Sequence, residues 1–574
     1  MAADIRDVVD TVSGRRPADL LLRGGRVVNV FTGDVDEAHV AICGDRIASV
    51  GPQHGSALRQ VDLGGAVLIP GLVDAHVHLE SALLTPGEFA RAAVPRGTAS
   101  VVADPHEIAN VLGTAGVRWM LEASRDLPLD VFLTAPSCVP ATMLETAGAE
   151  MGPEAIAEML AWERVIGLGE MMNVPGVVQG DPQVLAKLEA ARAAGRPLVG
   201  HCPGLSEAAL QAYAAAGISS DHESTALQEA NEKLSLGMAL MIREGSAARN
   251  LADLAPAVTD ATWPNCMLVT DDRDAEDLLA EGHMDHVLRR AVACGIEPVR
   301  AVQMATITPA RHFGLRGRGA IAPGFIADLT AVGDLRDFRA RLVVKGGQVV
   351  ARDGALTVDL PQAEIAAAGS SVRMAPLDRS ALRLAAGGGD VRVIGLVRDQ
   401  IVTRALCERP KTQRGEVLAD AGRDLLKLAV IERHRATGHA GVGLVRGFGL
   451  RRGALASTVA HDSHNVIAVG ADDEDMLCAV SELARMGGGL TVAAGGRALA
   501  SLALPVAGLM SPRPAHRVAA ALARLREAAG GLGCELENPF AALSFLALPV
   551  IPALRLTDRG LVDVSAMQHV PLAL

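Results

Sequence analysis

The middle of the chain, residues 68–317, alternates short apolar runs with amphipathic stretches. The apolar runs have the length of buried strands, and helical patterns such as 181–194 and 206–216 separate them. Repeated strand–helix units over about 250 residues are typical of a (β/α)₈ TIM barrel. Fewer than eight strands are clear, so closure of the barrel is an inference. The candidate strands are 99–103, 131–134, 165–169, 198–200, 217–220 and 267–269.

The two flanks of this segment have a different pattern. Residues 20–50 alternate apolar and polar positions around glycine-containing turns, and the same texture returns at 326–332 and 341–350. This predicts a composite β-sandwich domain built from 1–67 plus 318–384, around a barrel of 68–317. Strands and helices alternate again beyond residue 385, which predicts a further α/β domain at 385–574. The predicted fold class is therefore α/β.

Composition, net charge and cysteine content limit the domain number, the partners and the cellular compartment that we expect. A chain of 574 residues exceeds one hydrophobic core, so several domains are expected. The net charge of −12, without a compensating basic stripe, argues against nucleic acid or an anionic membrane as a partner. The eight cysteines are scattered without CxxC pairs, and no apolar stretch suits a membrane span. We expect a cytoplasmic protein with a small-molecule substrate.

The strongest local motif is Pro70-Gly-Leu-Val-Asp-Ala-His-Val-His78. Alternate residues of a strand face the same side, so His76 and His78 can point at one metal ion. Barrel strands present such ligands at their carboxyl ends. The alternative is a buried strand with two incidental, hydrogen-bonded histidines.

Further candidate ligands each follow a separate predicted strand. They are Glu170, His201, His222 and Asp271. Nitrogen and oxygen ligands without a thiolate favour Mn²⁺ or Fe²⁺, with Zn²⁺ also compatible. Six ligands exceed the need of one tetrahedral ion, so the sequence predicts two divalent metal ions.

This order of ligands resembles the amidohydrolase superfamily, whose members carry HxH on the first barrel strand and an aspartate after the eighth. Many members bridge two metals with a carboxylated lysine on the fourth strand, where this chain has Glu170. The resemblance therefore assigns the bridge to Glu170. The nearest lysine, Lys187, falls in the following helical segment, where we expect a solvated surface role.

Longer motifs resemble the bacterial adenine deaminase family more narrowly. They are 74–81, 84–89, the run Val101-Val-Ala-Asp-Pro-His-Glu-Ile-Ala-Asn-Val-Leu-Gly113, 270–272, Ala460-His-Asp-Ser-His-Asn465 and 544–562. The match covers nearly the whole chain. It implies hydrolytic deamination of adenine to hypoxanthine and ammonia, a reaction of purine salvage.

The implied chemistry assigns roles to several residues. A bound divalent ion lowers the pKa of water from 15.7 to about 7, and the hydroxide would attack C6 of adenine. Asp271 is the candidate to carry the proton to the departing amine. Glu223, Glu107 or His106 is the candidate to contact N1, and Glu223 has the alternative role of orienting a ligand histidine. Asp104, His106 and Glu107 are expected to line the mouth and bind substrate, with proton transfer, an additional metal or loop capping as alternatives.

Other histidines and cysteines have weaker claims. His461 and His464 could form another metal site, a lid over the barrel or a surface turn, while His283 and His286 are expected on a solvated helix face. Cys202 is not needed as a nucleophile. The competing functions are a cyclic-amide hydrolase of the hydantoinase or dihydroorotase kind, which would carry the bridging lysine, and a non-catalytic binding subunit. A homodimer is expected.

Overall fold

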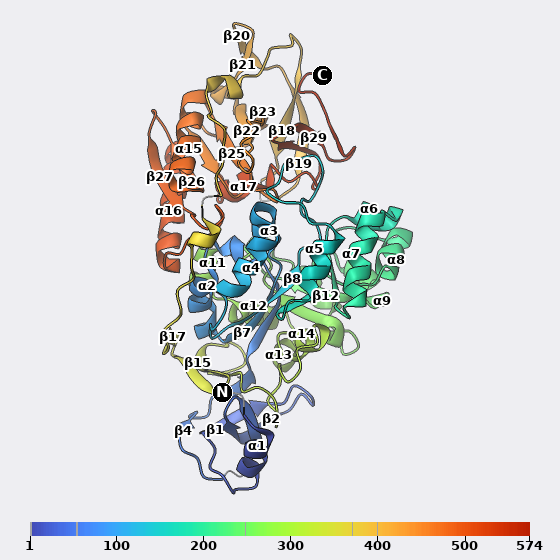
Figure 1. Cartoon of the computed structure of the whole chain (residues 1–574), viewed down its shortest axis with the longest axis vertical. Helices are drawn as coiled ribbons and strands as arrows, with labels where there is room; N and C mark the ends of the chain where they lie inside the picture. Colours follow the sequence, from blue (N-terminus) through green and yellow to red (C-terminus); the bar gives the residue numbers. More distant parts are fainter. Residues whose placement is uncertain (1–2, 53–54, 247, 370, 399) are drawn as a thin grey trace.

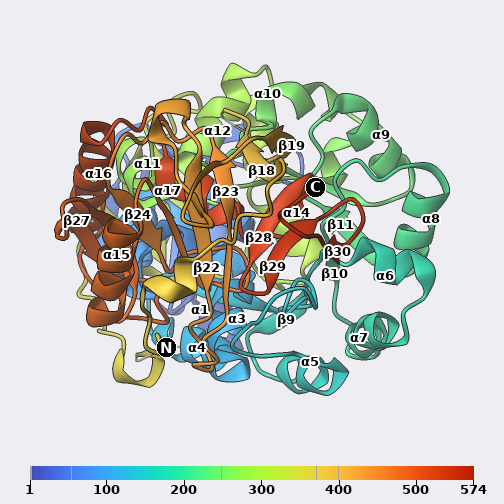
Figure 2. The same ribbon diagram turned by 90° about the horizontal axis from the view of Figure 1, so that it is seen from above.

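The central unit of the protein is a closed barrel of eight parallel strands (Figures 1 and 2). The computed structural model describes residues 3–52, 55–246, 248–369, 371–398 and 400–574. The strands pair in chain order, and Val77 and Asp271 form a parallel bridge that joins the last strand to the first. The amide of Asp271 donates to the carbonyl of His76 at 3.0 Å. The barrel strands are β6 (Leu72–Val77), β7 (Thr98–Ala103), β8 (Asp130–Ala135), β9 (Val165–Met171), β10 (Leu198–Gly200), β11 (Ile218–Asp221), β12 (Ala239–Arg243) and β13 (Cys266–Val269).

The seventh strand, β12, is the one that the sequence pattern did not reveal. Its core is an Ala-Leu-Met-Ile run that follows helix α9 (Leu227–Ser235) closely. Alanine, leucine and methionine favour helix when considered alone. Pairing with both neighbouring strands overrides that preference and completes the barrel.

Helices cover the outside of the barrel between these strands (Figure 2). Several begin at a proline that follows a capping side chain; Asp181, for example, accepts from the amides of Gln183 and Val184 at the start of α7. Besides α9, the barrel helices are α2 (Pro86–Ala93), α3 (His106–Leu112), α4 (Thr114–Ala123), α5 (Pro153–Leu160), α6 (Val174–Gln179), α7 (Pro182–Ala193), α8 (Glu207–Ala215), α10 (Leu251–Leu254), α11 (Ala275–Ala280), α12 (Met284–Ala293), α13 (Pro298–Met304) and α14 (Ile307–His312).

A nine-stranded sheet at the opposite end from the C-terminus combines both flanks of the barrel (Figure 1). Antiparallel pairing of β5 with β14 joins the two flanks. Helix α1 (Ile5–Val12) packs against this sheet. The strands are β1 (Leu20–Val28), β2 (Val35–Cys43), β3 (Arg46–Gly51), β4 (Gln60–Asp62), β5 (Val67–Pro70), β14 (Leu329–Val332), β15 (Ala340–Lys345), β16 (Gln348–Arg352) and β17 (Ala355–Leu356).

The C-terminal part is built on an eight-stranded mixed sheet with α15 (Asp473–Met486), α16 (Ala515–Gly531) and α17 (Pro539–Phe545). Only the β18–β23 pairing in this sheet is parallel. The sheet strands are β18 (Val391–Leu396), β19 (Thr403–Glu408), β22 (Leu426–Ile431), β23 (Ala440–Arg446), β24 (Ala454–Ser457), β25 (Val466–Gly470), β26 (Gly489–Ala493) and β27 (Ala498–Ala503). A two-stranded sheet pairs β20 (Lys411–Gln413) with β21 (Glu416–Leu418). A three-stranded sheet has the order β28 (Leu554–Thr557), β29 (Gly560–Asp563) and β30 (Gln568–His569).

This C-terminal part contacts the loops that follow the barrel strands (Figure 1). The amide of Ser511 donates to the carbonyl of Leu83 at 2.8 Å, and Asn465 donates to the carbonyl of Thr146 at 2.8 Å. Arg526 of α16 forms an ion pair with Glu276 of α11. Side chains of both parts therefore meet at the mouth of the barrel. Among the described residues, no helix combines the length and apolarity needed to cross a membrane.

Candidate metal centre and active site

The six expected metal ligands lie together at the carboxyl ends of the barrel strands. His76 belongs to β6 and His78 follows it, while Glu170 lies near the end of β9. His201, His222 and Asp271 come directly or almost directly after β10, β11 and β13. Five of them are buried and His201 is half-buried. Neighbouring strands of a parallel barrel end at one edge, which explains why residues far apart in sequence converge here.

Glu170 occupies the centre of this cluster. Its Oε2 lies 2.9 Å from Nε2 of His222, 3.2 Å from Nδ1 of His201 and 3.7 Å from Nε2 of His76. On the other side, Oδ1 of Asp271 lies 3.1 Å from Nε2 of His78 and 3.5 Å from Nε2 of His76. The donor atoms thus form overlapping groups that could hold more than one ion.

The protonation of His78 suits a metal ligand. Its Nδ1 faces the carbonyl of Asp104 at 3.0 Å, so Nδ1 carries a proton and Nε2 is the atom that faces Asp271. The buried Nε2 of His76 has no hydrogen-bond partner. Although burial opposes the charged form, Asp271 and Glu170 raise the pKa of His78 well above its ordinary value, so a bound cation would take the place of the Nε2 proton. Lone pairs and carboxylates facing one another in a buried site fit divalent cations.

Glu170 is held in place through its backbone. Its amide donates to Oδ2 of Asp104 at 2.8 Å, and its carbonyl accepts from the hydroxyl of Ser137 at 2.5 Å. Lys187 donates to the carbonyl of Ser137 at 2.7 Å, and burial lowers its pKa. The expectation of a solvated Lys187 is therefore wrong, because its ammonium stabilises the loop behind Glu170.

Glu223 lies beside the cluster, 3.6 Å from Nε2 of His222 and 3.8 Å from Nδ1 of His201. Its carboxylate forms an ion pair with Arg243, the last residue of β12. Arg243 also donates to Oδ2 of Asp271 at 3.0 Å. Arg243 was missed by the sequence reasoning because its strand was missed.

The first turn of helix α3, which follows β7, adds His106 and Glu107. Nδ1 of His106 lies 3.5 Å from Oε1 of Glu170 and 3.8 Å from Oδ1 of Asp104. Glu107 faces away from the first cluster toward the C-terminal part, where its oxygens lie 2.8 Å from Nδ1 of His461 and 2.5 Å from Nε2 of His464. His464 is fully buried and His461 nearly so, so they do not belong to a solvated surface turn.

The chain is similar to known proteins over nearly its whole length. Residues 67–350 match the amidohydrolase family, and residues 400–568 match the adenine deaminase C-terminal domain. An adenine deaminase of Methanothrix thermoacetophila is 50% identical over 99% of both chains. Adenine deaminases of Nitratidesulfovibrio vulgaris (51%, covering 98% of this chain and 97% of the relative) and Dehalococcoides mccartyi (47%, covering both chains fully) are also similar.

The chain belongs to the adenine deaminase family. This confirms the resemblance inferred from the Asp-Pro-His-Glu-Ile-Ala-Asn and Ala-His-Asp-Ser-His-Asn motifs. It also confirms the expected fold class, with an eight-stranded parallel barrel and an additional C-terminal domain.

Another expectation for this adenine deaminase family member concerns His283 and His286. His283 and His286 are buried, so the expectation of a solvated helix face is wrong. Nδ1 of His283 lies 2.8 Å from the hydroxyl of Thr98, and its Nε2 lies 3.2 Å from Asp74. Asp74 in turn accepts from the hydroxyl of Thr270 at 2.5 Å, next to Asp271. This network supports β6 and β13 from inside the protein.

Cys202 has no nucleophilic character in this environment. It is buried, its amide donates to Asp221 at 2.9 Å, and burial raises the pKa of its thiol. Lys233, also buried, donates to Asp221 at 2.7 Å and to the carbonyl of Cys202 at 2.9 Å. The pair therefore connects the loops that carry His201 and His222.

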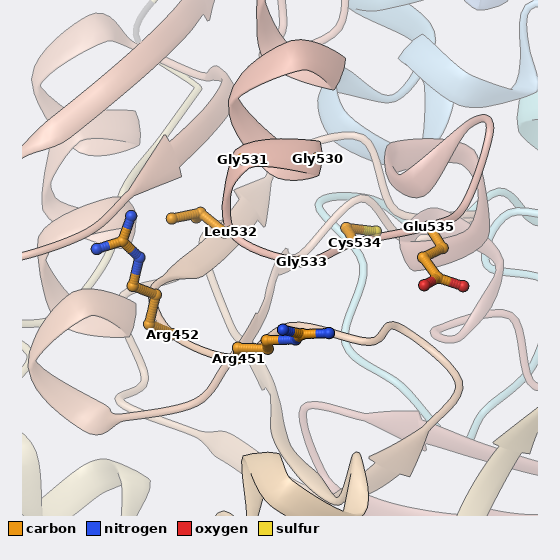
Figure 3. Close-up of a pocket in the computed structure, with 8 residues that line it drawn as sticks. All are labelled: Arg451, Arg452, Gly530, Gly531, Leu532, Gly533, Cys534 and Glu535. Carbon is orange, nitrogen blue, oxygen red and sulfur yellow. The ribbon is translucent and has the colours of Figure 1, made fainter.

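A surface hollow of about 380 Å³ lies elsewhere, on the C-terminal part (Figure 3). None of the six candidate ligands lines it. Its walls are Arg451, Arg452, Gly530, Gly531, Leu532, Gly533, Cys534 and Glu535.

Proposed function

We propose that this protein hydrolyses adenine to hypoxanthine and ammonia in purine salvage. Relatives about half identical over almost their entire length carry the name adenine deaminase, and this similarity is the observation that carries the proposal. The similarity extends through the barrel and the C-terminal domain, both of which contribute side chains at the mouth. The cluster of imidazoles and carboxylates at that mouth suits hydrolysis.

The proposed cofactor is a pair of Mn²⁺ or Fe²⁺ ions, with Zn²⁺ as a compatible substitute. His76, His78, His201 and His222 would supply nitrogen ligands, with Glu170 shared between the ions and Asp271 completing the set. When bound, such ions lower the pKa of a coordinated water and so supply the nucleophile. Glu170 would take the place that many amidohydrolases give to a modified lysine.

Asp271 is the proposed proton carrier. Its Oδ2 is fixed by Arg243, and its Oδ1 faces His78. Although burial opposes ionisation, His76, His78 and Arg243 hold the pKa of Asp271 well below its ordinary value, so its carboxylate is ionised. It accepts a proton from the attacking water and returns it to the exocyclic nitrogen as ammonia leaves. General acid–base help of this kind contributes roughly 10²–10⁴ in rate.

Substrate contacts are proposed for Glu223 and His106. Attack at C6 places negative charge on N1, and Glu223 lies beside His201 and His222 where it could contact that nitrogen. His106 lies beside Glu170, on the side of the cluster nearest the C-terminal domain. Asp104 orients the backbone of Glu170 and lies 3.8 Å from Nδ1 of His106. Glu107 lines the same mouth and is engaged by His461 and His464.

The proposal includes a homodimer that works in the cytoplasm. The scattered, unpaired cysteines fit a reducing compartment. Light scattering of the purified protein tests the dimer, since a mass of one chain would contradict it.

Ammonia release from adenine by the protein reconstituted with Mn²⁺ tests the function, with adenosine, cytosine and hydantoin as competing substrates. Release from adenine alone is expected, and Glu170→Gln should abolish it. Glu189→Gln is the matched control, because Glu189 is an exposed glutamate of α7. A fully metallated protein that leaves adenine unchanged contradicts the proposal, and turnover of hydantoin would favour a cyclic-amide hydrolase.

A further inference from the structure

Glu107, His461 and His464 form a second buried cluster of metal-ligating side chains. Glu107 belongs to helix α3 of the barrel, and the histidines lie in the loop between β24 and β25 of the C-terminal domain. Oε1 of Glu107 lies 2.8 Å from Nδ1 of His461, and Oε2 lies 2.5 Å from Nε2 of His464. One ligand atom from each of the three residues lies within 4.8 Å of the other two. The six ligands assigned to the catalytic pair do not include any of the three.

The direction of the donor atoms resembles that of the first cluster. In the described part of the chain, imidazole–carboxylate pairs closer than 3.2 Å occur in two places only: His78–Asp271 and His222–Glu170 in the first cluster, and the pairs around Glu107. The fully buried Nε2 of His464 makes no aligned hydrogen bond despite its short contact with Glu107. One imidazole nitrogen from each histidine and a carboxylate oxygen of Glu107 therefore lie close enough together to hold one cation.

The charges around Glu107 also call for a cation. Glu80 and Asp462 are buried beside this cluster, and each has a carboxylate oxygen without a hydrogen-bond partner. No arginine or lysine forms an ion pair with Glu80, Glu107 or Asp462 in the described residues. Several buried carboxylates side by side are costly, and a divalent ion would supply positive charge beyond what the neighbouring imidazoles carry.

We propose that Glu107, His461 and His464 bind a third divalent cation, which links the C-terminal domain to the barrel. Two imidazoles and one carboxylate without a thiolate suit Zn²⁺, Mn²⁺ or Fe²⁺. Three protein ligands leave a coordination position open beside His106, whose Nε2 lies 3.8 Å from Glu107. The site gives the C-terminal domain a direct role at the mouth of the barrel.

One contact must change when the cation binds. The amide of Ala460 donates to Nδ1 of His464 at 3.1 Å, whereas ligation through Nε2 requires the proton on Nδ1. Binding therefore costs one backbone hydrogen bond. That loss is small beside the binding free energy of a metal held by three ligands, so the cation decides the tautomer.

The test is the metal content of the full chain after saturation with Mn²⁺ and desalting, measured by inductively coupled plasma mass spectrometry. We expect three equivalents in the wild type and two in His464→Ala, His461→Ala and Glu107→Gln. His439→Ala is the matched control, because His439 is an exposed histidine of the same domain, and it should retain three. The thermal stability of the three site variants should also no longer depend on the third equivalent.

Two equivalents in the wild type overturn the proposal, as does a third equivalent that survives all three substitutions. Titration of the wild-type apoprotein with Co²⁺, followed by its visible absorption, counts the sites without any variant and keeps the test valid if a variant fails to fold. Ammonia release from adenine is scored separately. Its absence with three bound metals would contradict the proposed reaction and leave the third site standing.

Discussion

Arg243, at the end of β12, donates a hydrogen bond of 3.0 Å to Oδ2 of Asp271, which follows the neighbouring strand β13. The same guanidinium pairs with Glu223, which follows β11 next to His222. One buried cation therefore fixes the proposed proton carrier and the proposed N1 contact relative to each other. Such a fork between two carboxylates is a geometry that arginine, unlike lysine, satisfies well.

Arg243→Met should reduce kcat for adenine by roughly 10²–10⁴, because Asp271 loses its orientation and general acid–base help has that magnitude. Arg243→Lys should recover only part of the rate, since an ammonium cannot hold both carboxylates in the same way. Steady-state kinetics at saturating Mn²⁺ measures both variants. Equal rates for Arg243→Met and the wild type, with metal content unchanged, would show that Arg243 has no part in the reaction.

Gly169→Ala should reduce activity through Asp104. A Cβ atom at Gly169 would lie 2.4 Å from Oδ2 of Asp104, the oxygen that accepts from the amide of Glu170. Displacing that carboxylate releases Glu170 from its position, so Mn²⁺ affinity and kcat should both fall by at least about tenfold, as loss of a hydrogen bond that orients a ligand typically does. Equilibrium dialysis and ammonia release measure the two effects.

The control for this substitution is Gly389→Ala. A Cβ atom there meets nothing within 4 Å, and the backbone of Gly389 has no positive φ. Its metal affinity and activity should equal those of the wild type. If both alanine variants behave alike, the contact between Asp104 and Glu170 is not what holds the ligand.

The sequence predicted that the six candidate ligands lie together because each follows its own apolar strand, and parallel strands end at one edge. This regularity alone was enough to predict that His76, Glu170 and Asp271 lie close together. The residues that it could not place depend on contacts between distant segments. Glu107 and His464 are separated by more than half of the chain, and only the docking of the C-terminal domain brings them to 2.5 Å.

Local sequence patterns also gave wrong predictions where segments distant in the sequence cover a side chain. His283 and His286 have the spacing of an exposed helix face, yet packing of α12 against the barrel buries them. Lys187 was predicted at the surface because lysines are rarely buried. The carbonyl of Ser137 that accepts its hydrogen bond lies in a separate loop. The sequence around each of these residues therefore does not reveal the contacts that cover it.

Removing the metals should abolish activity and lower thermal stability together. A chelator withdraws cations that bind only the folded state, so Tm should fall by mass action and recover when Mn²⁺ returns. Differential scanning fluorimetry and ammonia release follow the two properties in parallel. In Glu170→Gln, the response of Tm to added Mn²⁺ should be weaker, since one shared carboxylate charge is lost. A Tm that does not respond to Mn²⁺ in the wild type would contradict metal binding at these clusters.

Lys233→Met should destabilise the protein by about 3–5 kcal/mol at neutral pH, because it leaves Asp221 buried without its partner. Thermal unfolding of the metal-free protein isolates this effect from metal binding. Lys411→Met is the control, since Lys411 is an exposed lysine of β20. Equal Tm values for the two variants would contradict the assigned role of the pair.

The pH dependence of this difference follows from the pKa of Asp221. Although burial opposes ionisation, Lys233 and then His222 hold that pKa well below its ordinary value. A depressed folded-state pKa gives stability that is complete above the unfolded value of about 3.9 and is lost as the pH falls below it. In Lys233→Met the uncompensated burial raises the pKa of Asp221, so protonation relieves the variant at low pH. The gap in Tm between the wild type and Lys233→Met should therefore narrow between pH 5 and pH 3, and a gap that stays constant over that range would show that the lysine stabilises the site by packing alone.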